Sequence, residues 1–74
     1  MINQIVKIVS EVLHIQANED TSQNNCGKWD SLHHLNIIVA LEETFDIYFE
    51  PEDIAKIKSI KDIEKTILKY KEGL

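Results

Sequence analysis

Residues 29–47, WDSLHHLNIIVALEETFDI, contain the pattern that decides the fold. With successive side chains 100° apart on a helix, one arc of about 100° holds four apolar residues: Ile37, Ile38, Leu41 and Phe45. This arc predicts a helix that begins near Ser31 and packs that face against a core. A second apolar stripe, centred about 130° from the first, is formed by Leu32, Leu35 and Val39.

The second stripe allows two interpretations. A helix in a small bundle needs one apolar face, and this helix has nearly two. In one interpretation, a short helix further along the chain covers part of the surplus with Ile54 and Ile57. In the other, the stripe is a docking face for a partner, apolar in the middle and edged by Asn36, Glu43 and Asp46. We expect each interpretation to hold in part.

The chain before this helix predicts one more helix and a long polar connection. Residues 3–15 place apolar side chains at spacings of three and four, with Asn3 as the expected N-cap. Residues 16–29 follow, with few apolar side chains among many polar ones. A connection this long in a small domain is more often functional or mobile than idle.

The chain after it predicts two further helices. Pro51 suits the first position of a short helix over about 51–57. Ser59 and Asp62 form a Ser-x-x-Asp capping arrangement, which predicts the start of a last helix over about 60–71. The predicted fold is therefore all-α: a four-helix bundle with three longer helices and one short, and a long loop between helices 1 and 2.

Length and composition restrict the function. A chain of 74 residues forms one domain, expected over residues 1–74, and is too short to enclose a deep pocket within a core. We therefore expect no independent enzyme, and favour a binding, carrier or interaction module. The net charge is −5 and every basic residue is lysine, which argues against a nucleic-acid partner.

Charge is spread unevenly along the chain. Residues 1–55 carry two lysines against ten acids, a balance of −8, whereas residues 56–74 carry six lysines against three acids, a balance of +3. The first part should attract basic partner surfaces. The single Cys26 cannot form an internal disulfide, and no apolar run approaches the length of a membrane helix. We expect a cytoplasmic protein with no membrane span and no metal.

The polar loop meets the central helix at Asp30-Ser31. Asp30 is an N-cap residue type, which would place Ser31 in the first helical turn with its hydroxyl outward. A helix N-terminus favours a phosphate that is bound or attached there. A serine here could carry a phosphodiester, although Asp-Ser before a helix is also ordinary capping.

Residues 29–47 resemble the acyl carrier protein family. The shared pattern is Asp-Ser-Leu at 30–32, then Leu-Glu-Glu-x-Phe at 41–45, then a short third helix and a fourth, an order that residues 29–68 follow. The resemblance implies that a phosphopantetheinyl transferase, using coenzyme A and magnesium, attaches 4′-phosphopantetheine to Ser31. The thiol of that arm would hold acyl or aminoacyl groups as thioesters for partner enzymes.

The resemblance also implies roles for other residues. Asp30 would support arm transfer. The implied partner-docking residues are Leu32, Leu35, Asn36, Val39, Glu43 and Ile54. Partners would be the transferase and acyl-activating, acyltransferase or synthase enzymes. His33 and Asn36 stand where housekeeping members usually have acids, a departure that argues against partners from fatty-acid synthesis. Trp29 before Asp-Ser, with His34-Leu35 after it, looks more like the free-standing carriers of specialised pathways.

Helix geometry argues against two alternatives to a carrier. Asp30, Ser31 and His34 are too close along one helix to converge as a catalytic triad. His33 and His34 lie 100° apart and are poorly placed to bind one metal, and His34 is expected to be half-buried and hydrogen-bonded. The remaining alternative is a small helical interaction module with no prosthetic group. From Met1 and the end soon after the last helix we expect a free-standing monomer.

Overall fold

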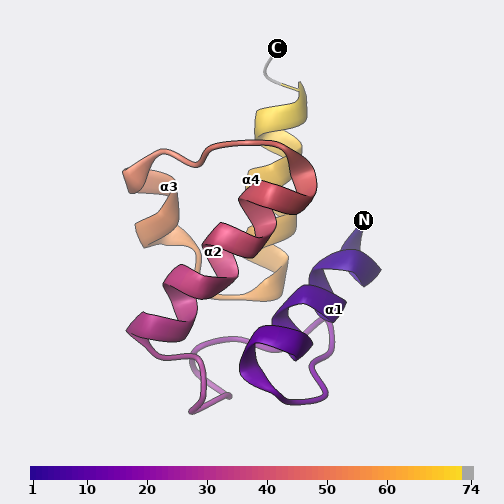
Figure 1. The fold of residues 1–74 in the computed structure, drawn as a ribbon, viewed down its shortest axis with the longest axis vertical. Coiled ribbons are helices and arrows are strands. Elements are labelled where there is room, and N and C mark those ends of the chain that lie inside the picture. Colours follow the sequence, from indigo (N-terminus) through magenta and orange to yellow (C-terminus); the bar gives the residue numbers. More distant parts are fainter. Residues whose placement is uncertain (73–74) are drawn as a thin grey trace.

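Four helices follow one another along residues 1–72, the part of the chain that the computed structural model describes. They are α1 (Ile2–Leu13), α2 (Ser31–Phe45), α3 (Pro51–Lys56) and α4 (Ile60–Glu72) (Figure 1). Within this part of the chain no strand forms, and one isolated bridge joins Ser22 to Ser59. The predicted all-α fold, with one short helix and a long loop between α1 and α2, is confirmed.

The core lies where α1 packs against α2 and α4. In Figure 1, α2 crosses in front of α4, α3 lies to one side, and the long loop passes below the helices. Each long helix contributes apolar side chains at helical spacing: Ile5, Val9 and Leu13; Ile37, Ile38 and Leu41; Ile60, Ile63 and Ile67. The predicted core arc of α2 is thus confirmed, with Phe45 half-buried and packed at the edge of the core.

The boundaries of α1 differ from the prediction over residues 3–15. The N-cap is Met1, not Asn3, and its side chain makes no capping hydrogen bond. The helix ends at Leu13 because His14 adopts the left-handed conformation (φ 56°), with its N–H bonded to the carbonyl of Ser10. Glycine usually occupies this conformation at the end of a helix, and a non-glycine residue there is uncommon. Because histidine stands here instead, the sequence has no glycine that would mark the end of α1.

The two later helices begin as predicted. Pro51 is the first residue of α3. The N–H of Asp62 donates to Ser59 Oγ at 3.1 Å, and Asp62 Oδ2 accepts from the N–H of Lys58 at 2.9 Å. The first bond satisfies a backbone donor that the start of α4 would otherwise leave unpaired, and the second pairs the N–H of Lys58, which precedes the helix.

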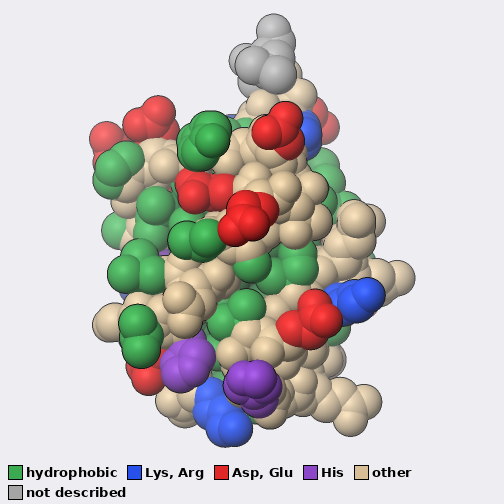
Figure 2. Space-filling view, in the orientation of Figure 1, with side chains coloured by type: hydrophobic (Ala, Val, Ile, Leu, Met, Phe, Trp, Pro, Cys, Tyr) green, Lys and Arg blue, Asp and Glu red, His purple; other side chains and the backbone are tan. Residues whose placement is uncertain are grey.

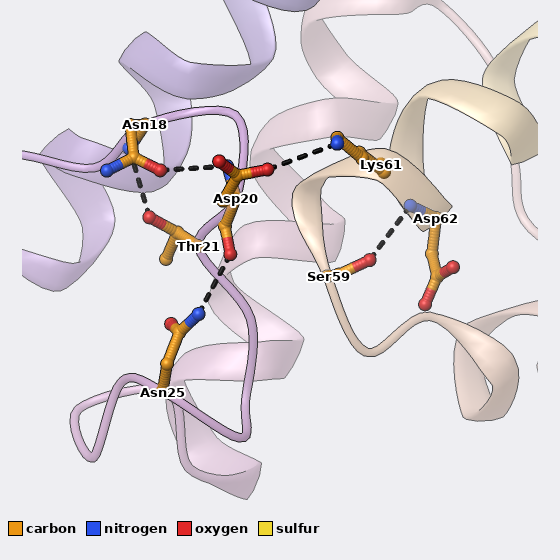
Figure 3. Close-up of polar contacts among 7 residues, drawn as sticks. All are labelled: Asn18, Asp20, Thr21, Asn25, Ser59, Lys61 and Asp62. Atoms are coloured by element: carbon orange, nitrogen blue, oxygen red, sulfur yellow. Dashed lines mark hydrogen bonds and ion pairs between the residues drawn. The ribbon is translucent and has the colours of Figure 1, made fainter.

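Short-range hydrogen bonds order the long loop between α1 and α2 (Figure 3). The N–H of Asn18 donates to Thr21 Oγ1 at 3.0 Å, and Asn18 Oδ1 accepts from the N–H of Asp20 at 2.8 Å. Asn25 Nδ2 donates to the carbonyl of Asp20 at 2.8 Å. Asn, Asp and Thr side chains form such turns in place of regular secondary structure.

A backbone bridge ties this loop to the start of α4. The N–H of Ile60 donates to the carbonyl of Thr21 at 3.1 Å, and the N–H of Gln23 donates to the carbonyl of Lys58 at 2.8 Å. Lys61 Nζ lies 3.1 Å from Asp20 Oδ1 beside it, in an exposed ion pair. The loop is therefore tied to the start of α4 near its middle.

A polar cluster fixes the short helix α3 on α4. Asp53, one of two buried polar residues in the described chain, accepts from Lys69 Nζ at 2.8 Å and from the Tyr70 hydroxyl at 2.7 Å. These two hydrogen bonds, that from Lys69 being the stronger cause, hold the pKa of Asp53 below its usual value. Burial raises the pKa of Tyr70, so its hydroxyl stays protonated and donates. The Asp53 carboxylate is thus ionised and paired.

Replacing Asp53 by asparagine is expected to destabilise the protein at neutral pH and to have less effect in acid. A carboxylate whose pKa is lowered by folding stabilises the protein fully above about pH 4, the ordinary value for aspartate, and loses that contribution as pH falls through the lower folded pKa. Thermal unfolding of wild type and Asp53→Asn, from neutral pH to about pH 2, measures the gap. A gap that stays constant down to the lowest pH would contradict this role.

Candidate functional site

The start of α2 presents a capped serine. Asp30 has extended backbone (φ −95°, ψ −176°), and its Oδ1 accepts from the N–H of His33 at 2.9 Å. Ser31 is therefore the first helical residue, and its side chain is exposed. No hydrogen bond of the Ser31 hydroxyl occurs among residues 1–72. The predicted cap and outward hydroxyl are both confirmed.

Asp30 is held as an ionised carboxylate. The backbone N–H of His33, first, and then the His33 side chain hold the pKa of Asp30 below its usual value. His33 Nδ1 lies 2.8 Å from the same Oδ1, and an ionised carboxylate can only accept, so Nδ1 carries the proton of that bond. A negative charge thus stands one residue before the exposed serine, at the positive end of the helix dipole.

Two substitutions at Asp30 separate its cap from its charge. Asp30→Ala should cost about 1 kcal/mol of stability because the cap is lost, whereas Asp30→Asn should cost much less because asparagine caps equally well. If the charge supports arm transfer, both variants should accept the arm more slowly than wild type. Urea unfolding and the initial rate of modification measure the two effects. If the Asp30→Asn protein is modified at the wild-type rate, the charge of Asp30 has no role in arm transfer.

Behind the serine, Trp29 is buried against the core and His34 lies beside it. The Trp29 indole N–H donates to His34 Nδ1 at 2.9 Å, and His34 Nε2 lies 2.9 Å from the carbonyl oxygen of Ile54 in α3. His34 is half-buried and hydrogen-bonded, as predicted. Neither of its hydrogen-bond partners could be predicted from the periodicity of the sequence, because neither bond follows a helical spacing.

The second stripe of α2 remains exposed. The exposed fractions of Leu32, Leu35 and Val39 are 67%, 55% and 52%. Ile57, at the end of α3, is buried in the core and Ile54 is half-buried against it, and the three side chains of the stripe stay more than half exposed. In Figure 2, hydrophobic side chains gather on the side of the molecule where α2 and α3 lie.

The structure brings the other expected docking residues to the same two helices. Asn36 and Glu43 are exposed on α2. Tyr48, in the link between α2 and α3, is 84% exposed, a feature that the sequence analysis missed. No periodic pattern could have found it, because the link between α2 and α3 follows no helical spacing. Beyond the Asp30 carboxylate, the exposed surface of α2 is apolar and uncharged through Leu35 and Val39 and becomes acidic towards the end of the helix.

A metal centre and a membrane-spanning helix are not found among the described residues. No group of three or more His, Cys, Asp or Glu side chains in residues 1–72 is placed to hold a metal ion. No helix of the described chain has the length and apolar character needed to cross a bilayer.

Comparison with known proteins shows which family the chain is similar to. A family model described as "Phosphopantetheine attachment site" matches residues 3–67. An acyl carrier protein from Syntrophus aciditrophicus (strain SB) is 31% identical over 64 residues, an alignment that covers 81% of this chain and 79% of that protein. The family match includes α2 and the residues around Ser31.

Proposed function

Since this chain belongs to the acyl carrier protein family, whose members carry a phosphopantetheine arm, we propose that Ser31 is the residue to which the arm is attached. The chain is a phosphopantetheine-dependent acyl carrier, and acyl carriers are not themselves catalysts. The observation that supports Ser31 above all others is its position: exposed, first in α2, and directly after the capping Asp30.

The residues at this position fit a phosphodiester. The hydroxyl of Ser31 is accessible to a transferase, and the unpaired N–H groups and dipole at the start of α2 favour the negative charge of a phosphate. The arm, when attached, supplies a thiol that holds acyl groups as thioesters. In attachment, the Ser31 oxygen bonds to phosphorus, its proton leaves, and the pyrophosphate bond of coenzyme A breaks to release the nucleotide.

The exposed stripe supports a docking role for α2. The second stripe (the apolar strip of Leu32, Leu35 and Val39) starts beside Ser31, and Glu43 lies further along α2. Acyl-handling enzymes and a phosphopantetheinyl transferase are the partners that the family implies. We propose that they contact this strip together with Asn36 and Ile54. Because a thiol-bearing arm needs a reducing compartment, we also propose a cytoplasmic location.

Intact mass measurement tests the proposed carrier function. The purified chain, incubated with coenzyme A, magnesium and a phosphopantetheinyl transferase, is expected to gain the mass of one arm and one free thiol beyond that of Cys26. Fragmentation should place the gain in the peptide that contains Ser31. If no transferase adds the arm, the alternative of a helical interaction module without a prosthetic group is favoured.

Charge reversal at Glu43 tests the docking face. Glu43→Lys should weaken binding of the transferase, mainly through a slower association rate, and the loss should shrink as salt rises. The melting temperature should hardly change, because an exposed charge contributes less than about 1 kcal/mol to stability. Val39→Glu should weaken binding more, since it places a charge within the apolar strip.

A matched control is Glu11→Lys, which makes the same charge change at an exposed position of α1. It should leave binding near the wild-type value at physiological salt. If Glu11→Lys and Glu43→Lys weaken binding equally, net charge rather than the α2 face determines docking. If neither they nor Val39→Glu affect the transferase, this partner does not use the strip.

A further inference from the structure

His34 connects the segment before Ser31 to α3. Its ring lies in the first turn of α2, with Nδ1 2.9 Å from Trp29 Nε1 and Nε2 2.9 Å from the carbonyl oxygen of Ile54. An indole nitrogen only donates and a carbonyl oxygen only accepts. Nδ1 must therefore offer a lone pair and Nε2 must carry the proton. Both contacts require the neutral ring in this one tautomer.

Each partner lacks another way to pair. Trp29 is 4% exposed, and a buried N–H without an acceptor is costly. The carbonyl of Ile54 lies in the last turn of α3, where helical acceptors lose their partners. The N–H that would serve it in a longer helix, that of Lys58, donates instead to Asp62 Oδ2. His34 supplies the missing donor.

The bond to Ile54 also fixes α3 in relation to α2. A helix of six residues is not stable alone and depends on tertiary contacts. On the α4 side, Asp53 supplies these contacts through Lys69 and Tyr70. On the α2 side, His34 makes the hydrogen bond between a side chain and the α3 backbone. The ring thus joins two parts of the surface around Ser31.

We propose that His34 is a positioning residue for arm transfer. It holds the Trp29-Asp30-Ser31 segment and α3 in one arrangement, so that a transferase meets the serine and the α2–α3 surface as a single preformed site. This inference rests on the proposed role of Ser31. His34 has no contact with the reacting hydroxyl and acts through Trp29 on one side and Ile54 on the other.

Two conservative variants separate the two sides of the ring. The amide oxygen of His34→Asn takes the place of Nδ1 and can accept from Trp29, but it reaches no further. The amide nitrogen of His34→Gln takes the place of Nε2 and can donate to Ile54. We expect His34→Asn to raise the KM for the carrier at unchanged kcat, because α3 is loosened, and His34→Gln to lower kcat, because the Ser31 segment is loosened.

Steady-state kinetics of arm transfer, with coenzyme A and the transferase, measure these effects. A lost hydrogen bond corresponds to a change of about three- to tenfold in kcat/KM for each conservative variant. His34→Leu should lose both contacts and show the larger loss. Trp29→Phe removes the indole donor, and combining it with His34→Gln should lower kcat no further than either substitution alone.

The single tryptophan provides a spectroscopic readout independent of activity. The indole N–H resonance of Trp29 should keep its position in His34→Asn and move in His34→Gln and His34→Leu. Wild-type kcat and KM in both conservative variants, with the indole resonance moved in His34→Gln, would overturn the proposal. A wild-type chain that accepts no arm would instead refute the role of Ser31, so the two failures are distinguishable. If His34→Leu does not fold, the conservative pair alone decides.

Discussion

Ser31→Ala is expected to abolish arm attachment and to leave the fold unchanged. The substitution removes an exposed hydroxyl that makes no hydrogen bond in the described chain, while the cap from Asp30 remains. Its effect on stability should stay within about 0.5 kcal/mol. Intact mass after incubation with coenzyme A and the transferase measures the attachment, and circular dichroism measures the helical content.

The control for this experiment is another serine. Ser22→Ala alters a half-buried loop residue whose Oγ accepts from the N–H of Asn24, and it should gain the arm as wild type does. A gain of one arm by Ser31→Ala would show that the modified residue lies elsewhere. It would also remove the basis for the role given to Asp30, since that role depends on the neighbouring hydroxyl.

Leu41→Ala is expected to have the largest effect on stability. Leu41 is fully buried between α2 and the helices it packs against, so its truncation leaves a cavity and should cost about 2–5 kcal/mol. Small domains have total stabilities of only about 5–15 kcal/mol, so the loss is a large share. Urea unfolding followed by circular dichroism gives the value.

Leu35→Ala is the matched comparison, because it removes the same atoms from the same helix. Leu35 is 55% exposed on the second stripe, and its truncation should change stability by no more than about 0.5 kcal/mol. The opposite ranking would mean that the two faces of α2 have been assigned the wrong way round. Leu35→Ala should instead weaken partner binding, which Leu41→Ala affects only through unfolding.

Helical periodicity was sufficient to predict most of the fold. On α2 the pattern separated Ile37 and Leu41, which are buried, from Leu35, which is exposed. Such a separation is possible because burial in a helix follows a fixed angle per residue. Pro51 and the Ser59–Asp62 pair marked two helix starts, since each acts through bonds between residues close in sequence.

One helix end, and the features that depend on long-range geometry, were not predicted. The sequence gives no sign that α1 stops at His14, because the left-handed turn there uses histidine instead of glycine. Asp53 follows Glu52 in a charged stretch that suggests a solvated helix start, yet it is buried because Lys69 and Tyr70 arrive from α4. Only the tertiary fold brings those three side chains together.

The candidate site likewise contains some features that the sequence predicts and others that depend on the tertiary fold. The cap of Asp30 on the start of α2 was predicted, because an N-cap bonds to a backbone donor three residues along. The contact between His34 and the carbonyl of Ile54 was not, since it joins residues on two different helices. The exposure of Tyr48 likewise depends on how the link leaves α2.

The backbone bridge between the long loop and the start of α4 bears on the order in which the chain folds. Helices form quickly from local contacts, whereas this bridge joins Thr21 and Gln23 to Lys58 and Ile60, from opposite halves of the chain. Closing so large a loop has an entropic cost that two hydrogen bonds offset only weakly. We therefore expect the bridge to form after the rate-limiting step. Weakening it should shorten the lifetime of the folded state and leave the refolding rate unchanged.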